Sequence, residues 1–193
     1  MTTALTRFQT QYVARKALFK LLGNAFRIHN TDGSLAFYVK QKAFKLKEDI
    51  TVFADEGEKD AVLRIQARSA LDFSATYDVT EVATGESVGA LQRKGLKSIL
   101  RDEWAILDAS GAEIGKVQED SAFLAMVRRF LSNLVPQSFT FTIGEASVGS
   151  VKQHFNPFRV GYDVDFTAGA GKLDPRLGVA AVVMLLAIEG RQK

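Results

Sequence analysis

The stretch LGVAAVVMLLAI, Leu177–Ile188, contains no charged or strongly polar residue. As a helix this run would extend about 18 Å, whereas a membrane-spanning helix needs about 20 residues. Its length is more typical of a buried core helix, with a membrane anchor and an oligomer contact as alternatives. Asp174 before Pro175 supplies an N-cap and a first-turn proline, so we expect a helix over about 175–189. Because that helix is apolar all round, other elements should surround it.

A repeated pattern occupies most of the chain before this run. Similar fragments, each an apolar residue followed by polar or basic ones, begin at Val39, Ile65, Leu91, Val117 and Val151. The first four begin 26 residues apart, and the fifth begins 34 residues later. Upstream, a glycine typically follows Asp, Ser or Thr, which is turn chemistry because glycine tolerates positive φ. Short apolar or β-branched segments flank the turns, so each unit predicts a β-hairpin.

The hairpins account for ten strands, and two lone strands complete the count. One begins near Tyr12 and leads the first hairpin, and the other is centred on Tyr162–Phe166. Twelve antiparallel strands in sequence order favour a barrel, which removes exposed sheet edges. A barrel of this width is too wide for its own side chains to fill. The sequence therefore predicts a mainly β fold: a twelve-stranded antiparallel barrel of repeated hairpins enclosing the hydrophobic C-terminal helix.

We call the second strand of each hairpin its return strand. Two details of the return strands modify the simple alternation of side chains between the two faces of the sheet. Ile114 and Val117 lie an odd number of residues apart, so they face opposite sides of the sheet unless a bulge intervenes. Gly89, Gly115 and Gly149 occupy equivalent positions inside return strands. Because strand glycines often mark a close approach, we expect them to make room for something packed inside.

The longer interval before the fifth hairpin predicts an inserted amphipathic helix over about 120–135. Its apolar residues recur at helical spacing from Phe123 to Leu134, with Arg128 and Arg129 off that face and Pro136 at the end. Such a helix either packs over the barrel rim or lies on a membrane surface.

The hairpin pattern resembles a known family. The segments FRIHNTDGSLAFYVKQKAFKL, LRIQARSAL and YDVTEVATGESVGALQRKG are similar to those of the LURP-one-related family. The closing part, VKQHFNPFRVGYDVDF followed by LGVAAVVMLLAIEG, also resembles the end of phospholipid scramblases. The resemblance implies a tubby-like fold in which residues 1–193 form a single domain.

What the resemblance implies about function is less specific. Tubby C-terminal domains bind phosphoinositides through a basic patch, scramblases move lipids between leaflets in a calcium-linked way, and LURP-one-related proteins mostly lack an assigned biochemical activity. This chain matches neither the tubby phosphoinositide signature nor the scramblase calcium segment.

Composition and motifs exclude several other classes. The net charge of +3 is too weak to indicate nucleic-acid binding, and the chain has no cysteine. The two histidines, His29 and His154, lie far apart in the sequence, so we expect no metal site and no cofactor. The GAGK motif at Gly169–Lys172 is followed by Leu173 in place of the Ser or Thr of a phosphate-binding loop. With no catalytic motif and no secretory signal, a non-enzymatic cytoplasmic protein is expected.

Basic residues recur in the return strands and after them, and they supply the candidate site. The residues predicted to contact anionic lipid headgroups are Lys40, Lys42, Arg93, Lys94, Lys97, Arg128, Arg129 and Lys152. The alternative interpretation is a solvated outer face. The leading hypothesis is thus a binding or scaffold module, peripheral at a membrane, whose partner is anionic lipid or another protein. A scramblase-like lipid-handling protein and a barrel that carries a ligand in an empty lumen are the alternatives, and the oligomeric state is left open.

Overall fold

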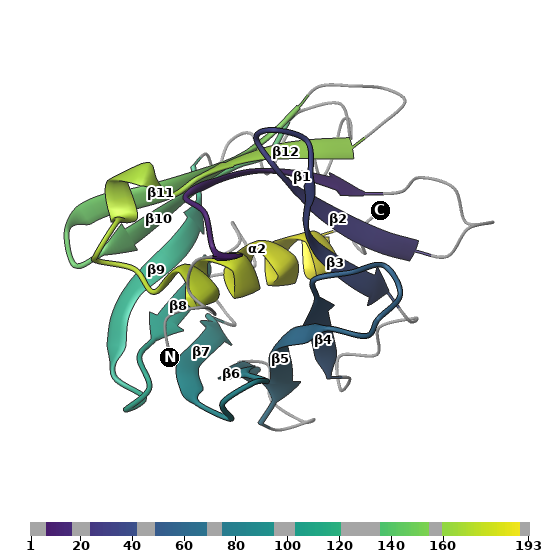
Figure 1. The fold of residues 1–193 in the computed structure, drawn as a ribbon. Helices are drawn as coiled ribbons and strands as arrows, with labels where there is room; N and C mark the ends of the chain where they lie inside the picture. Colours follow the sequence, from purple (N-terminus) through teal and green to yellow (C-terminus); the bar gives the residue numbers. More distant parts are fainter. Residues whose placement is uncertain are drawn as a thin grey trace.

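The computed structural model describes residues 7–16, 24–41, 49–68, 75–94, 103–120, 136–154 and 160–189. Twelve strands occupy most of these ranges (Figure 1). They are β1 (Gln11–Lys16), β2 (Asn24–Asn30), β3 (Leu35–Gln41), β4 (Ile50–Phe53), β5 (Ala61–Ala67), β6 (Thr76–Glu81), β7 (Ser87–Arg93), β8 (Glu103–Leu107), β9 (Glu113–Glu119), β10 (Ser138–Ile143), β11 (Ala146–Gln153) and β12 (Val160–Asp165). A short 3-10 helix, η4 (Thr167–Gly169), leads to the helix α2 (Pro175–Glu189).

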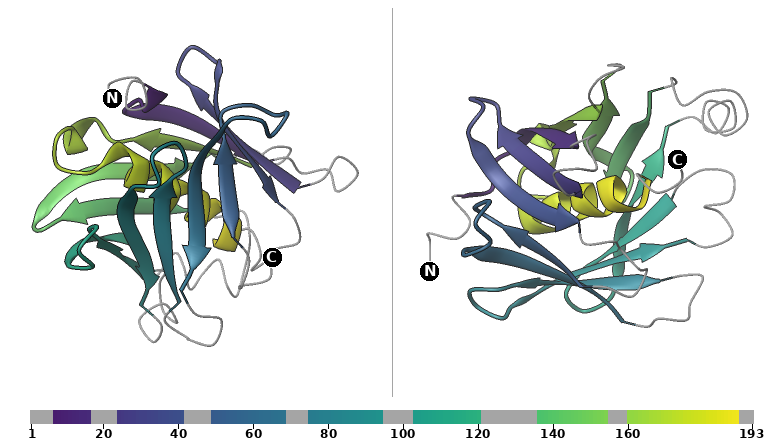
Figure 2. Two further views of the ribbon diagram at one scale, coloured as in Figure 1. Left: turned by 60° about the horizontal axis from the view of Figure 1, so that its bottom comes forward. Right: turned by 90° about the vertical axis from the view of Figure 1, so that its right-hand side faces the viewer.

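The strands form one closed antiparallel barrel in chain order. Each strand pairs with its sequence neighbours, and β1 closes the ring by pairing with β12, with Tyr12 opposite Val164. The predicted fold is therefore confirmed, including the two lone strands that complete the five hairpins. The barrel appears in Figure 2 from two further directions, with α2 passing through it in both.

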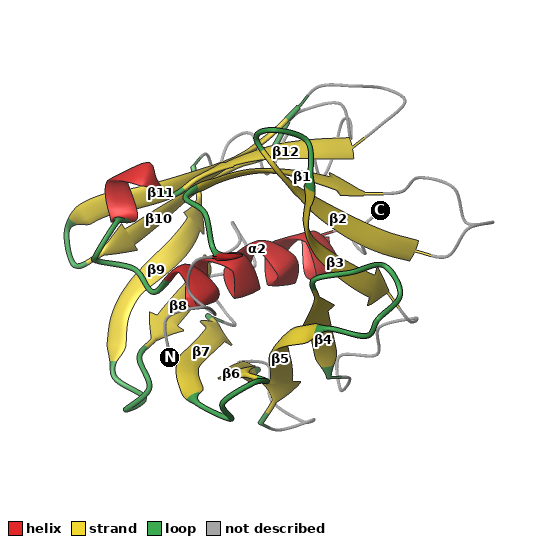
Figure 3. Ribbon diagram, viewed as in Figure 1, coloured by secondary structure: helices red, strands yellow, loops and turns green. Residues whose placement is uncertain are grey.

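The helix α2 forms the centre of the core, as the apolar run predicts. Every side chain from Leu177 to Ala187 is buried, Val183 completely. Its start is capped as expected, because the Arg176 backbone N–H donates to Asp174 Oδ1 at 2.8 Å. Figure 3 shows this helix surrounded by the strands. The ligand-carrying barrel with an empty lumen is thereby wrong, since α2 fills the lumen.

A β-bulge recurs at the same place in all five hairpins and explains the repeat. In each return strand one residue is skipped by the pairing with the first strand. The skipped residues are Ala36, Val62, Val88, Ile114 and Val148, so a bulge does intervene at Ile114, one of the two outcomes that the spacing left open. An extra residue lets two positions three apart face the same side. Val88 and Leu91 accordingly both pack in the core.

The three return-strand glycines accommodate different neighbours. A Cβ on Gly149 would lie 2.3 Å from Phe166 Cδ1, so this glycine admits a group packed inside. A Cβ on Gly89 would lie 2.4 Å from the Leu107 backbone oxygen on the adjoining strand β8 and 3.0 Å from Leu177 Cδ1, so Gly89 admits both a close strand and the helix. For Gly115 the expectation was wrong. Its closest neighbour would be the Thr142 backbone oxygen, at 2.0 Å, on the adjoining strand β10. There the glycine permits close approach of two strands.

Two predictions are not decided by this architecture. The inserted helix expected over about 120–135 lies almost wholly outside the described residues, as do Arg128 and Arg129. The assignment of residues 1–193 to a single domain also stays a prediction.

Candidate functional site

The barrel has two ends with different chain connections. We call the hairpin end the one formed by the turns 31–34, 54–60, 82–86, 108–112 and 144–145, where α2 also begins. At the opposite end, the connection end, chain segments join β1 to β2 and each hairpin to the next. Because α2 fills the barrel between them, any ligand site must lie on the outside or at an end.

Four of the eight predicted headgroup residues belong to the described part of the chain. Lys40 lies near the end of β3, Arg93 closes β7 with Lys94 directly after it, and Lys152 lies near the end of β11. Three are on return strands, which run toward the connection end, and Lys94 directly follows one. The other four, Lys42, Lys97, Arg128 and Arg129, lie outside the described residues, within segments that connect strands at this end.

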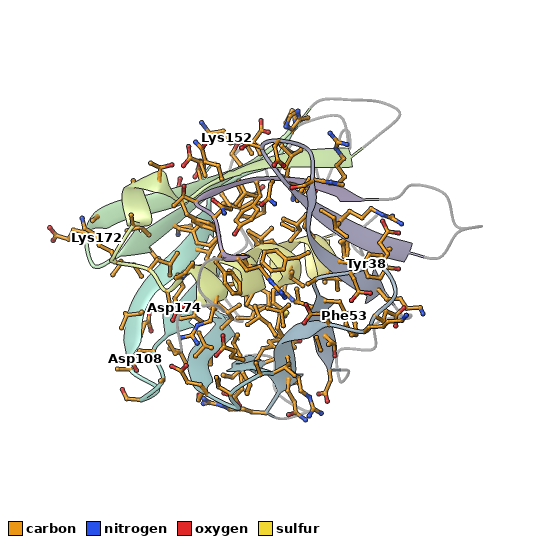
Figure 4. The ribbon with its side chains drawn as sticks, viewed as in Figure 1. Tyr38, Phe53, Asp108, Lys152, Lys172 and Asp174 are labelled. Carbon is orange, nitrogen blue, oxygen red and sulfur yellow. The ribbon has the colours of Figure 1, made fainter. Side chains whose placement is uncertain are left out.

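These four residues do not form a strip along one face of the barrel. Strands β3, β7 and β11 are separated from one another by four steps around the ring, so the residues are distributed around it. Lys152 is exposed on β11 (Figure 4). Lys40 Nζ is 2.6 Å from Glu58 Oε1, and Lys94 Nζ is 2.6 Å from Glu113 Oε2. Contacts with Glu58 raise the pKa of Lys40, whose amine stays charged near neutral pH. A ligand at Lys40 or Lys94 would have to compete with an existing carboxylate partner.

The sequence divides charge unevenly between the segments that connect hairpins and the turns within them. The segments that join strands at the connection end, with the residues after α2, contain thirteen Lys or Arg and five Asp or Glu. The basic ones are Lys20, Lys42, Lys45, Lys47, Arg68, Lys94, Lys97, Arg101, Arg128, Arg129, Arg159, Arg191 and Lys193, and the acidic ones are Glu48, Asp49, Asp72, Asp102 and Asp120.

The hairpin end has the opposite balance. Residues 1–10, the five turns and segment 166–174 contain nine acidic and three basic residues. The acidic ones are Asp32, Asp55, Glu56, Glu58, Asp60, Glu86, Asp108, Glu145 and Asp174, and the basic ones are Arg7, Lys59 and Lys172. In the sequence, the segments that connect hairpins are therefore mainly basic and the hairpin turns mainly acidic, in a protein whose net charge is only +3.

An interior ion cluster at the hairpin end was missed by the sequence interpretation. The Arg176 side chain, 9% exposed, lies 2.8 Å from Glu86 Oε2, 2.8 Å from Asp174 Oδ2 and 3.3 Å from Glu81 Oε2. Thr84 Oγ1 donates to the same Glu81 oxygen at 2.7 Å. One signal was available, since Arg176 is the only charged residue between Pro175 and Ile188.

The Arg176 cluster links the start of α2 to the β6–β7 hairpin through salt bridges to Glu81 and Glu86. Hydrogen bonds to Asp174 and then Glu86 raise the pKa of Arg176, and the Arg176 hydrogen bonds lower the pKa of Glu86. All three carboxylates face the one guanidinium, so the arrangement is a salt-bridge cluster centred on Arg176. Across the described ranges, no group of three or more His, Cys, Asp or Glu side chains is placed to hold a metal ion.

Comparisons with known proteins agree with this barrel architecture, a closed antiparallel sheet around one apolar helix. The family model described as LURP-one-related matches residues 35–186. The chain therefore belongs to the LURP-one-related family, and this membership suggests a tubby-like barrel domain. The family is not known as enzymatic. No curated protein matches the chain.

A solved structure shares the fold. The X-ray structure of a protein from Arabidopsis thaliana aligns with a TM-score of 0.54 and 12% sequence identity, covering 96% of each chain. At this identity the likeness concerns the fold alone. In the parts of the chain that are described, no helix is long and apolar enough to cross a membrane.

Proposed function

We propose that this protein is a non-enzymatic binding module that attaches to anionic phospholipid or phosphoinositide headgroups through its connection end. It would be a peripheral protein of a cytoplasmic membrane surface. The observation that supports the proposal is the division of charge in the sequence, with a basic excess in the segments that connect hairpins and an acidic excess in the hairpin turns. A weakly basic protein with this polarity would approach an anionic surface in one orientation.

The expected attraction follows from the number of basic residues near the surface. Each Lys or Arg close to an anionic membrane contributes about 1 kcal/mol, and the contribution fades within a Debye length. Lys40 and Lys94 already have carboxylate partners, so their contribution to the attraction for the membrane is reduced. The largest contribution would come from the connecting segments, which contain Lys42, Lys97, Arg128 and Arg129. Lys152, exposed on β11, would add to them.

Co-sedimentation with vesicles tests both the attraction and the orientation. Binding should be stronger to phosphatidylcholine vesicles that contain phosphatidylserine than to phosphatidylcholine alone, and added salt should weaken it. The double variant Lys42→Glu/Lys97→Glu should lose at least about tenfold in affinity, since each reversal removes about 1 kcal/mol or more.

A matched control changes the net charge equally at the opposite end. The variant Lys59→Glu/Lys172→Glu alters two exposed residues of the hairpin end and should retain wild-type binding. Equal losses in both variants would show that net charge alone governs binding. That outcome, or binding that ignores anionic lipid and salt, would contradict the proposed orientation.

A further inference from the structure

One junction of the barrel has almost no β-ladder. Strands β3 and β4 are joined by a single residue pair, Tyr38 opposite Phe53, both labelled in Figure 4. Every other neighbouring pair of described strands shares four to six residue pairs. Val39, Lys40 and Gln41 continue β3 beyond Tyr38, and they have no ladder partner on β4. We call this junction the β3–β4 seam.

Ion pairs cross the seam where backbone pairing is missing. The β4–β5 turn, residues 54–60, supplies the three carboxylates. Arg27 on β2 makes a bidentate contact with Glu56, at 2.8 and 2.7 Å. Lys40 on β3 contacts Glu58 at 2.6 Å, and Arg7 before β1 contacts Asp60 at 2.9 Å. Each cation comes from one side of the seam and each carboxylate from the other.

The outer face of the seam continues the same connection. Tyr38 lies between Arg27 on β2 and Phe53 on β4 in the cross-strand register. The Arg27 guanidinium lies 5.5 Å from the centre of the Tyr38 ring, a cation–π distance. Arg27 therefore contacts both Tyr38 at the seam and the turn carboxylate of Glu56. Its hydrogen bonds to Glu56 raise the pKa of Arg27 and lower that of Glu56.

The β4–β5 turn is shaped to present these carboxylates. Asp55 organises it, since its Oδ2 accepts hydrogen bonds from the backbone N–H groups of Lys59, at 3.1 Å, and Asp60, at 2.7 Å. Glu58 has φ of 58°, the only positive φ among described residues other than glycine. Left-handed backbone is unfavourable for a residue other than glycine because its Cβ approaches the following carbonyl oxygen. The turn accepts this strain at the residue whose side chain contacts Lys40.

We propose that the β3–β4 seam is a lateral gate of the barrel, held closed by the ion pairs of the β4–β5 turn instead of by a backbone ladder. Exposed ion pairs are individually weak, and salt screens them. Salt does not screen the backbone hydrogen bonds of a β-ladder in this way. The side chains of these three pairs are between 30% and 54% exposed. Opening is therefore favoured by high ionic strength and by anions that compete with the carboxylates for Arg27, Lys40 and Arg7.

Parting at the seam would uncover interior residues beside α2. Phe37 and Val39 on β3 and Val52 on β4 are completely buried and belong to the central core. An opened seam would present these apolar side chains between two unpaired strand edges. Edges of that kind accept an added strand or other apolar contacts. The gate is inferred from the barrel alone and does not depend on the proposed headgroup binding.

Amide hydrogen exchange across the intact chain tests the gate. Amides of β3 and β4 should exchange faster than those of β6 and β7 in the wild-type protein, and raising the salt should accelerate only the former. The variant Glu56→Gln/Glu58→Gln/Asp60→Asn keeps the side-chain shapes and removes the three ion pairs. It should raise the exchange rate of amides in β3 and β4 by about tenfold, because three exposed ion pairs together change the equilibrium constant for opening the seam by about that factor.

The control removes ion pairs of similar exposure where the ladders are complete. Asp78→Asn/Glu113→Gln deletes the carboxylates that contact Arg68 and Lys94. This variant should leave exchange in β3 and β4 unchanged. If β3 and β4 are as protected as β6 and β7 at all salt concentrations, or if the triple variant and the control behave alike, the gate is refuted.

Discussion

The Phe166 ring sits between two glycines, and adding one methyl group beside it tests how tightly α2 is packed. On one side lies Gly149 in the barrel wall, and on the other lies Gly178 in α2. An edge-to-face contact with Phe141, with ring centres 5.0 Å apart, limits sideways movement. The substitution Gly149→Ala therefore introduces a group for which neither the wall nor the helix leaves space.

The expected cost follows from the distances. The new Cβ would lie 2.3 Å from Phe166 Cδ1 and 2.9 Å from the Asp165 backbone oxygen. Relief requires the ring to move toward Gly178, which has no Cβ, so the backbone of α2 limits that movement. Overpacking of this kind lowers the free energy of unfolding by about 1–3 kcal/mol. Replacing glycine by alanine also reduces the conformational entropy of the unfolded chain, which raises the free energy of unfolding by about 0.4–1 kcal/mol. For a chain of this size a net loss of about 1–2 kcal/mol lowers the Tm by about 2–8 °C.

Thermal and urea unfolding of matched variants provide the assay. Gly161→Ala on neighbouring β12 is the control, because its Cβ would meet nothing closer than the Ala14 backbone oxygen at 3.8 Å. That variant should be neutral or up to about 1 kcal/mol more stable. In a Phe166→Leu background the cost of Gly149→Ala should shrink, since the smaller side chain leaves room. If Gly149→Ala is as stable as Gly161→Ala, the packing argument is wrong.

Two further predictions concern the ion cluster at the start of α2. Arg176→Met should destabilise the protein by about 3–5 kcal/mol, because it leaves Glu81 buried without its cation, and adding Glu81→Gln should recover part of the loss in urea unfolding. The folded-state pKa of Glu86 is lowered from 4.5, so its ion pair stabilises the protein above that pH, and the contribution disappears as the pH falls through the folded pKa. Glu86→Gln should therefore lower the Tm at neutral pH and have no effect at the acid end of a pH series, whereas an equal Tm difference at every pH would rule out this linkage.

The barrel and its central helix could be predicted because their signals are local or periodic. The apolar run from Leu177 to Ala187 excludes a surface helix by composition, and the repeated glycine turns mark each hairpin. The odd spacing of Ile114 and Val117 left either opposite faces or a bulge, and the structure shows a bulge in all five hairpins. Such patterns require only the period of the strand and the chemistry of turns.

The remaining features depend on the stagger between hairpins, which no local pattern encodes. Arg176 finds Glu81 and Glu86 only because α2 passes the β6–β7 turn inside the closed barrel. The close approach at Gly115 depends on the position of β10. The short β3–β4 ladder likewise reflects how two hairpins meet. The basic residues were recognised individually, but their distribution around three sides became visible only with the ring order of the strands.

The central claim is that α2 fills the barrel and so restricts ligand sites to the outside and the ends. Because the chain has no cysteine, a single introduced thiol reports on one position. Val183, in the middle of α2, is completely buried, and Ser147 on β11 is exposed. In native buffer the thiol of Ser147→Cys should react at once with a thiol reagent, while that of Val183→Cys should react only at the rate of global unfolding. Equal reactivity of the two thiols in the native protein would contradict a helix-filled barrel.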